Sequence, residues 1–256
     1  MRSIALLILS AVTVGWLAGP VVAGKPKVSE EGVKDGQRIF ERACQFCHGA
    51  AGRGDGPAAF FIGSYSAPRP KDFTKNDYKF RSTPSGDLPT EEDLFRTVTS
   101  GIPGVMPSFG SLTEAERWQV IAYVTSLNPE FKKSAARPLA IVGAPIPLTG
   151  ESIERGRATY QRFDCQSCHG ADGRGDGPVS VAGELKDARG FPIQATDLTS
   201  PSSFKNGGSI RDIVRSIMTG LDGTPMPSYA DQLKGSEEDV WHLANYLSSL
   251  APPHHP

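Results

Sequence analysis

The chain has 256 residues, of which 38% are hydrophobic and 21% are charged, and its formal net charge is −1 at pH 7. This composition is typical of a globular protein with one or two domains. The nearly balanced charge argues against nucleic acid as a partner.

The N-terminal segment departs from that composition. It carries one charge at Arg2 and then an uncharged, mostly apolar stretch from Ile4 to Ala23. We predict a signal peptide over residues 1–23, with a small-residue cleavage site after Ala23. Because about 20 uncharged residues also suffice to span a bilayer, an uncleaved N-terminal anchor is the alternative. In both cases we expect the folded part to be periplasmic or otherwise exported, with membrane association only through this segment.

The next feature is a repeated pentapeptide that contains all four cysteines. Cys44-Gln45-Phe46-Cys47-His48 recurs in the second half of the chain as Cys165-Gln166-Ser167-Cys168-His169, and a helix is expected before each, over residues 33–43 and 152–162. Cys-x-x-Cys-His is the attachment signature of c-type haem, in which two thiols bond the haem and the histidine ligates the iron. We therefore predict two covalently bound haem c groups.

Other uses of paired cysteines fit the pattern less well. The two pairs are much farther apart than the pairs of a zinc ribbon, and a redox dithiol needs no adjoining histidine. The sequence after each motif is also repeated, since residues 49–57 and 170–178 differ at one position. The repeat therefore favours haem over zinc or a dithiol.

The repeat divides the chain into two units. We expect a first domain over residues 30–130, here called the first unit, and a second domain over residues 150–251, the second unit. Residues 131–149 contain several prolines and are expected to form an extended linker rather than a helix. Residues 252–256 are expected to be a disordered tail.

Both units continue with the same elements. The passages 49–89 and 170–208 are rich in Gly and Pro and have no sustained period, so we expect mostly loop. Helices then begin at Thr90 and Ser209, each a hydroxyl N-cap followed by an acidic residue three positions later. Glycines supply the stop signals of these two helices, Gly101 and Gly220.

The last helix of each unit is expected to start at Thr113 and at Ser236. Each has an apolar stripe at helical spacing: Val120, Tyr123, Val124 and Leu127 in the first unit, and Leu243, Tyr246, Leu247 and Leu250 in the second. Neither unit shows a strand pattern, which indicates an all-α fold.

A histidine-ligated haem iron has a sixth position that is either ligated or open. Met106 is the one methionine of the first unit, so by elimination we predict that it ligates the first iron opposite His48. The second unit offers Met218 and Met226. We favour Met226, with His169, because its Met-Pro-Ser-aromatic context repeats that of Met106, whereas Met218 falls on the apolar face of a helix.

The remaining histidines are weaker candidates for ligation. His242 borders the apolar stripe of the last helix and is expected at the surface or partly packed. His254 and His255 fall in the predicted tail.

These motifs, in this order, resemble class I cytochromes c, present as two tandem domains over about residues 30 to 250. The resemblance implies a few helices and long loops around one covalent haem per domain. In that family a glycine and an aromatic residue on the first helix cross an aromatic residue on the last. The matching sets are Gly36, Phe40 and Tyr123 in the first unit, and Gly156, Tyr160 and Tyr246 in the second. One extra residue between Tyr160 and Cys165 departs from the pattern.

The resemblance also implies a proline carbonyl that accepts the free ring N–H of the iron-bound histidine. Pro57 and Pro178 match that proline in position. A plain turn proline is the alternative at both places.

The resemblance and the two His/Met pairs imply an electron carrier, without catalytic residues, that moves single electrons between a donor and an acceptor protein. One alternative is a haem subunit of a membrane-bound oxidoreductase or respiratory complex, which the N-terminal anchor would support. Another is a di-haem peroxidase or sulfur-compound oxidase. Peroxide chemistry needs an open or displaceable sixth position, and related sulfur oxidation uses an additional cysteine that this chain lacks.

Overall fold

The computed structural model describes residues 25–61, 68–134 and 136–251. The predicted signal segment and the tail with His254 and His255 lie outside the described residues. In the described part, all regular secondary structure is helical, and β-pairing is limited to two isolated bridges. The all-α prediction is thus confirmed. None of the helices in this part has the length and apolar character needed to cross a membrane.

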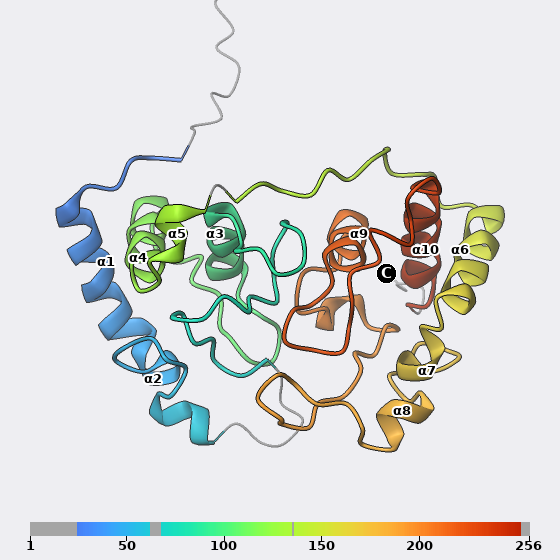
Figure 1. Ribbon diagram of the computed structural model, residues 1–256, viewed down its shortest axis with the longest axis horizontal. Helices are drawn as coiled ribbons and strands as arrows, with labels where there is room; N and C mark the ends of the chain where they lie inside the picture. Colours follow the sequence, from blue (N-terminus) through green and yellow to red (C-terminus); the bar gives the residue numbers. More distant parts are fainter. Residues whose placement is uncertain (1–24, 62–67, 135, 252–256) are drawn as a thin grey trace, which may run out of the picture.

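Among the described residues, five helices belong to the first unit and six to the second. The first contains α1 (Glu30–Ala43), α2 (Gln45–His48), η1 (Pro57–Phe60), α3 (Glu91–Ser100) and α4 (Glu114–Ser126). The second contains α6 (Gly150–Arg162), α7 (Gln166–His169), α8 (Pro178–Val181), η2 (Pro201–Ser203), α9 (Ile210–Thr219) and α10 (Glu238–Ser249). Figure 1 shows the units side by side, with α1 and α6 at the outer ends and α3 and α9 toward the middle.

Three of the predicted helix starts are confirmed by reciprocal hydrogen bonds. Thr90, Thr113 and Ser209 each accept a backbone N–H with the side chain, and the acidic residue three positions later bonds back to the N-cap N–H. Gly101 and Gly220 end α3 and α9 at positive φ, as expected. These caps satisfy N–H groups that a helix otherwise leaves without partners.

The other three starts differ from the prediction. α1 begins at Glu30 rather than near residue 33, because the Ser29 side chain caps it through the Gly32 N–H at 3.1 Å. α6 likewise begins at Gly150, capped by Thr149. α10 begins at Glu238, and Ser236 is not its N-cap: its backbone belongs to the preceding turn, donating to the Leu233 carbonyl.

The first and last long helices of each unit cross at a glycine. A Cβ on Gly36 would lie 2.0 Å from the Gln119 carbonyl oxygen of α4, and a Cβ on Gly156 would lie 2.1 Å from the His242 carbonyl oxygen of α10. The aromatic partners that the resemblance implies do meet. Ring centroids are 5.2 Å apart for Phe40 and Tyr123, and 5.4 Å apart for Tyr160 and Tyr246. Only glycine permits this close approach of two helix backbones.

In the described residues, a short helix, α5 (Glu130–Lys133), covers the end of the first unit and the start of the linker, where an extended segment was expected. The side chain of Asn128 starts it by accepting the Glu130 N–H at 3.0 Å. From residue 136 to 149 the linker has neither helix nor strand, and it runs over both units in Figure 1. It is bonded to both, since Leu139 N–H donates to the Ser82 carbonyl and the indole N–H of Trp241 donates to the Val142 carbonyl.

Candidate functional site

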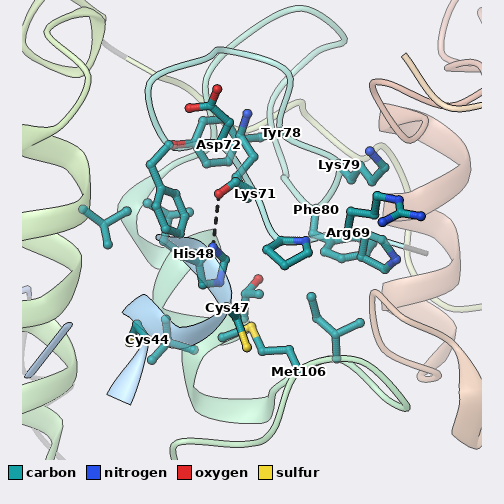
Figure 2. Close-up of a pocket in the computed structure, with 18 of the residues that line it drawn as sticks. Cys44, Cys47, His48, Arg69, Lys71, Asp72, Tyr78, Lys79, Phe80 and Met106 are labelled. Atoms are coloured by element: carbon teal, nitrogen blue, oxygen red, sulfur yellow. Dashed lines mark hydrogen bonds between the residues drawn. The ribbon is translucent and has the colours of Figure 1, made fainter. Parts of the chain in front are cut away.

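The structure gathers the predicted residues of the first unit around one cavity of about 330 Å³ (Figure 2). Cys44, Cys47, His48 and Met106 all line it. Much of the remaining wall is apolar and comes from α1, α3, α4 and the loop after Met106: Phe40, Leu94, Val98, Phe109, Ile121 and Val124. A flat apolar cofactor with a central metal matches such a lining.

The helix that enters the motif places its side chains. α1 ends at Ala43, where the Cys44 N–H donates to the Phe40 carbonyl at 2.8 Å, and α2 then makes a single turn. In that turn Cys44, Cys47 and His48 occupy positions i, i+3 and i+4, which share one helix face. Both thiols and the imidazole therefore face the same cavity.

Hydrogen bonding fixes how the histidine ring presents its nitrogens. His48 Nδ1 lies 3.1 Å from the Lys71 carbonyl oxygen. Because a carbonyl only accepts, Nδ1 carries the hydrogen and Nε2 keeps its lone pair, which is the form that binds metal. Burial lowers the pKa of His48, which favours the neutral ring.

The second unit repeats this arrangement around a cavity of about 360 Å³. Cys165, Cys168, His169 and Met226 line it. His169 Nδ1 lies 2.9 Å from the Thr196 carbonyl oxygen, and burial lowers the pKa of His169. Met218 does not line the cavity; it is 6% exposed and packs in the core of the second unit. The expectation that Met218 is core filler is confirmed.

The two methionine loops are closed by the same backbone bonds. Ile102 N–H donates to the Met106 carbonyl at 2.8 Å, and Leu221 N–H donates to the Met226 carbonyl at 3.0 Å. A serine two residues after each methionine donates back to the preceding helix; for Ser228 the acceptor is the Met218 carbonyl at 2.6 Å. Each methionine thus lies in a loop held by these hydrogen bonds, and it lines the same cavity as the histidine of its unit.

The two cavities have a common wall. Pro68, Lys79 and Phe80 line both of them. In Figure 2, Lys79 and Phe80 lie on the side of the first cavity that faces the orange ribbon of the second unit. Burial lowers the pKa of Lys79, and nearby acidic groups, Asp187 first, oppose that effect. Groups held in the two cavities would have these three residues between them.

The cysteine, histidine and methionine side chains of the two cavities indicate which cofactor fits. All four cysteines are free thiols, divided between the two cavities, so they do not form one four-cysteine site. Burial raises the pKa of Cys44 and of Cys165 to about 11. In residues 25–61, 68–134 and 136–251 there is no group of three His, Cys, Asp or Glu side chains able to hold a metal ion. Two thiols, one imidazole and one thioether around an apolar cavity fit haem c in each unit.

Two segments, residues 31–124 and 151–247, match the family model described as cytochrome c oxidase, cbb3-type, subunit III. The chain belongs to this cytochrome c family. A chain in a solved structure titled Kuenenia stuttgartiensis reducing HAO-like protein complex Kustc0457/Kustc0458 is 38% identical, with a TM-score of 0.80. The match covers 90% of the present chain and 100% of that chain. A comparison with curated proteins gave no significant match.

One expectation drawn from the cytochrome c resemblance is wrong. Pro57 and Pro178 do not supply the acceptors of the histidine N–H groups, because the Lys71 and Thr196 carbonyls take that place. Each proline instead occupies the start of a short helix, η1 or α8. Proline suits that position because the first helical residue needs no N–H partner.

The extra residue before the second motif is absorbed locally. Asp164 has φ 54°, a left-handed conformation that aspartate tolerates better than most side chains. Its carboxylate accepts from the Gln166 amide at 2.8 Å. The bend ends α6 at Arg162 and still brings Cys165 and His169 to the cavity.

His242 is more buried than expected, at 5% exposure, and it lines neither cavity. Its Nδ1 is 2.8 Å from the Ser152 hydroxyl, where α6 and α10 cross. It therefore belongs to the helix crossing and not to a metal site.

Proposed function

We propose that this cytochrome c binds two haem c groups and transfers single electrons between protein partners outside the cytoplasm. The observation that carries the proposal is the duplicated donor set, two thiols, a neutral imidazole and a thioether around each apolar cavity. In the proposal Cys44, Cys47, Cys165 and Cys168 hold the haems, His48 and Met106 ligate one iron, and His169 and Met226 ligate the other. The domain bounds 30–130 and 150–251 belong to the same proposal.

When bound, haem c supplies a metal that changes oxidation state by one electron. The protein's part is to hold both axial positions and to exclude water. Histidine and methionine together raise the potential of a haem, and filled axial positions leave no place for a substrate. The apolar walls lower the local dielectric constant, and the hydrogen-bonded methionine loops limit movement of the ligands.

The wall shared by the cavities supports exchange of electrons between the two haems. Among the described residues, Pro68, Lys79 and Phe80 line both cavities. A short separation favours electron transfer within the chain, so one haem would receive the electron and the other deliver it.

A second candidate is an electron-transfer subunit of a stable oxidoreductase complex. It is favoured by the solved structure described above, which is titled as a protein complex and matches over 90% of the present chain. This candidate shares the redox chemistry but adds a permanent partner. Size analysis of the protein purified from its source distinguishes them, because a free carrier elutes as a single chain.

Reductive titration of the purified holoprotein tests the proposal. We expect two reversible one-electron steps per chain and no turnover of peroxide or thiosulfate. Uptake of one electron per chain, or sustained peroxide turnover, would contradict it. A matched control is the Met106→Ala variant, in which an opened sixth position should allow peroxide to react at one haem.

A further inference from the structure

A buried arginine joins the first unit to the methionine loop of the second. Arg81 is fully buried, and its guanidinium donates to the Tyr78 carbonyl at 2.9 Å and the Pro84 carbonyl at 3.1 Å within its own unit. It also donates to the Thr219 carbonyl at 2.7 Å and to Asp222 Oδ1 at 2.8 Å. The last two acceptors belong to the second unit, at the end of α9 and just after it.

Asp222 is held by three donors of the first unit. Besides Arg81, the Ser85 hydroxyl donates to its Oδ1 at 2.7 Å and the Gly86 N–H donates to its Oδ2 at 2.9 Å. The carboxylate side chain is only 15% exposed. Charged hydrogen bonds in such partly dry surroundings are stronger than those at the surface, and they fix geometry.

Asp222 lies in the same short loop as the proposed iron ligand. The loop runs from Gly220 to Met226 and is closed by the bond between Leu221 N–H and the Met226 carbonyl. Inside it, Met226 N–H donates to the Thr224 hydroxyl, which in turn donates to the Leu221 carbonyl. A shift of Asp222 is therefore passed to Met226 through a few bonded residues.

The first unit provides an internal comparison. Gly101 and Gly220 correspond, and two positions later the first unit has Pro103 where the second has Asp222. A proline side chain has no hydrogen-bond acceptor, so the Met106 loop cannot be held in the way that Asp222 is held. We call the hydrogen bonds from Arg81, Ser85 and Gly86 to Asp222 the clamp. Any effect of the clamp should reach one haem only.

We propose that Arg81 and Asp222 are positioning residues for the second haem: docking of the first unit holds the 220–226 loop so that Met226 stays on the iron. The inference rests on the proposed function, since it takes Met226 as the ligand. Because coupling between two equilibria is reciprocal, loss of the Met226 bond to iron should also weaken docking of the units.

The test compares Asp222→Asn with Asp239→Asn in the oxidised holoprotein. Asp239 is a matched control, because it is 16% exposed and is paired with Arg162 at 2.7 Å within the second unit, at the start of α10. The readouts are the iron–thioether absorption and the binding of added imidazole. In Asp222→Asn we expect imidazole to bind one iron per chain on the order of tenfold more tightly, with part of the absorption lost. Asp239→Asn should behave as the wild type.

The Met226→Ala variant separates failure of the inference from failure of the proposed function. If Met226→Ala keeps the full absorption, the ligand assignment is wrong. If Met226→Ala loses half of it while Asp222→Asn keeps wild-type absorption and imidazole binding, the proposed function stands and the clamp is overturned. Should Asp222→Asn fail to fold, Ser85→Ala removes one exposed donor to the same carboxylate. It should raise imidazole affinity at one iron severalfold, and no change there overturns the clamp.

Discussion

Phe73 stacks on the imidazole of His48, with ring centroids 4.6 Å apart and an angle of 25° between the planes. Leu198 holds the corresponding place in the second unit. Phe73 N–H donates to the Gly52 carbonyl at 2.7 Å, and Leu198 N–H donates to the Gly173 carbonyl at 2.6 Å. The backbone hydrogen bonds near the two histidines are therefore equivalent, but the side chains at the corresponding positions differ.

Phe73→Leu should move one midpoint potential and leave the other in place. The substitution gives His48 the kind of neighbour that His169 has, so we expect the difference between the two potentials to narrow. It also removes an aromatic contact worth about 0.5–1.5 kcal/mol of stability. A redox titration checks this, with Leu198→Phe as the reciprocal variant. Equal shifts of both potentials would count against separate histidine environments.

Met226→Ala and Met218→Ala should have opposite effects. Met226 lines the second cavity, so its loss should remove the thioether absorption of that haem. Met218 is buried in the core, so its loss should leave the spectrum unchanged and lower the free energy of unfolding by about 2–5 kcal/mol. Absorption spectra and denaturant titrations of both variants check the assignment, and the reverse pattern would transfer the ligand role to Met218.

Gly156→Ala should strongly destabilise the second unit. The new Cβ would meet the His242 carbonyl at 2.1 Å, and a backbone atom cannot move aside as a side chain can. Forcing the helices apart should cost at least about 1–3 kcal/mol. Gly150→Ala is the control in the same helix, because nothing lies within 4 Å of its Cβ position. Thermal unfolding should show a lowered Tm for Gly156→Ala only; similar Tm values for both would contradict the close crossing.

His242 should make stability depend on pH. Burial lowers the pKa of its imidazole in the folded protein, and Arg155 adds to the effect. Its Nε2 has no hydrogen-bond partner within the described part of the chain. Below about pH 6.5, the ordinary histidine pKa, the unfolded chain binds a proton that the folded protein resists, so the free energy of unfolding falls as pH decreases.

The measurement is the free energy of unfolding of the wild type and of His242→Gln between about pH 7.5 and about pH 5. The wild type should lose more stability over this range. Parallel pH profiles of the two proteins would show that His242 does not titrate on unfolding.

Much of the fold could be predicted because its signals are local. The caps at Thr90, Thr113 and Ser209 and the two Cys-x-x-Cys-His motifs lie within a few residues of the structure they specify. The apolar stripes also repeat at helical spacing, which reveals the buried face.

The features that sequence reasoning missed depend on contacts between distant segments. The acceptors for His48 and His169 are backbone carbonyls, and a carbonyl has no side-chain signature. Prolines after the motif matched the family pattern in position and so were chosen wrongly. The pairing of Arg81 with Asp222 joins the two units, and no local pattern marks either residue as a partner of the other.

The central claim, one covalent haem in each unit, is tested most directly by the intact mass of the exported protein under denaturing conditions. We predict a mass increase equal to two haem groups, and an increase of one haem in a Cys165→Ala, Cys168→Ala variant. A wild-type protein with one haem or none, or haem that dissociates on denaturation, would contradict the claim.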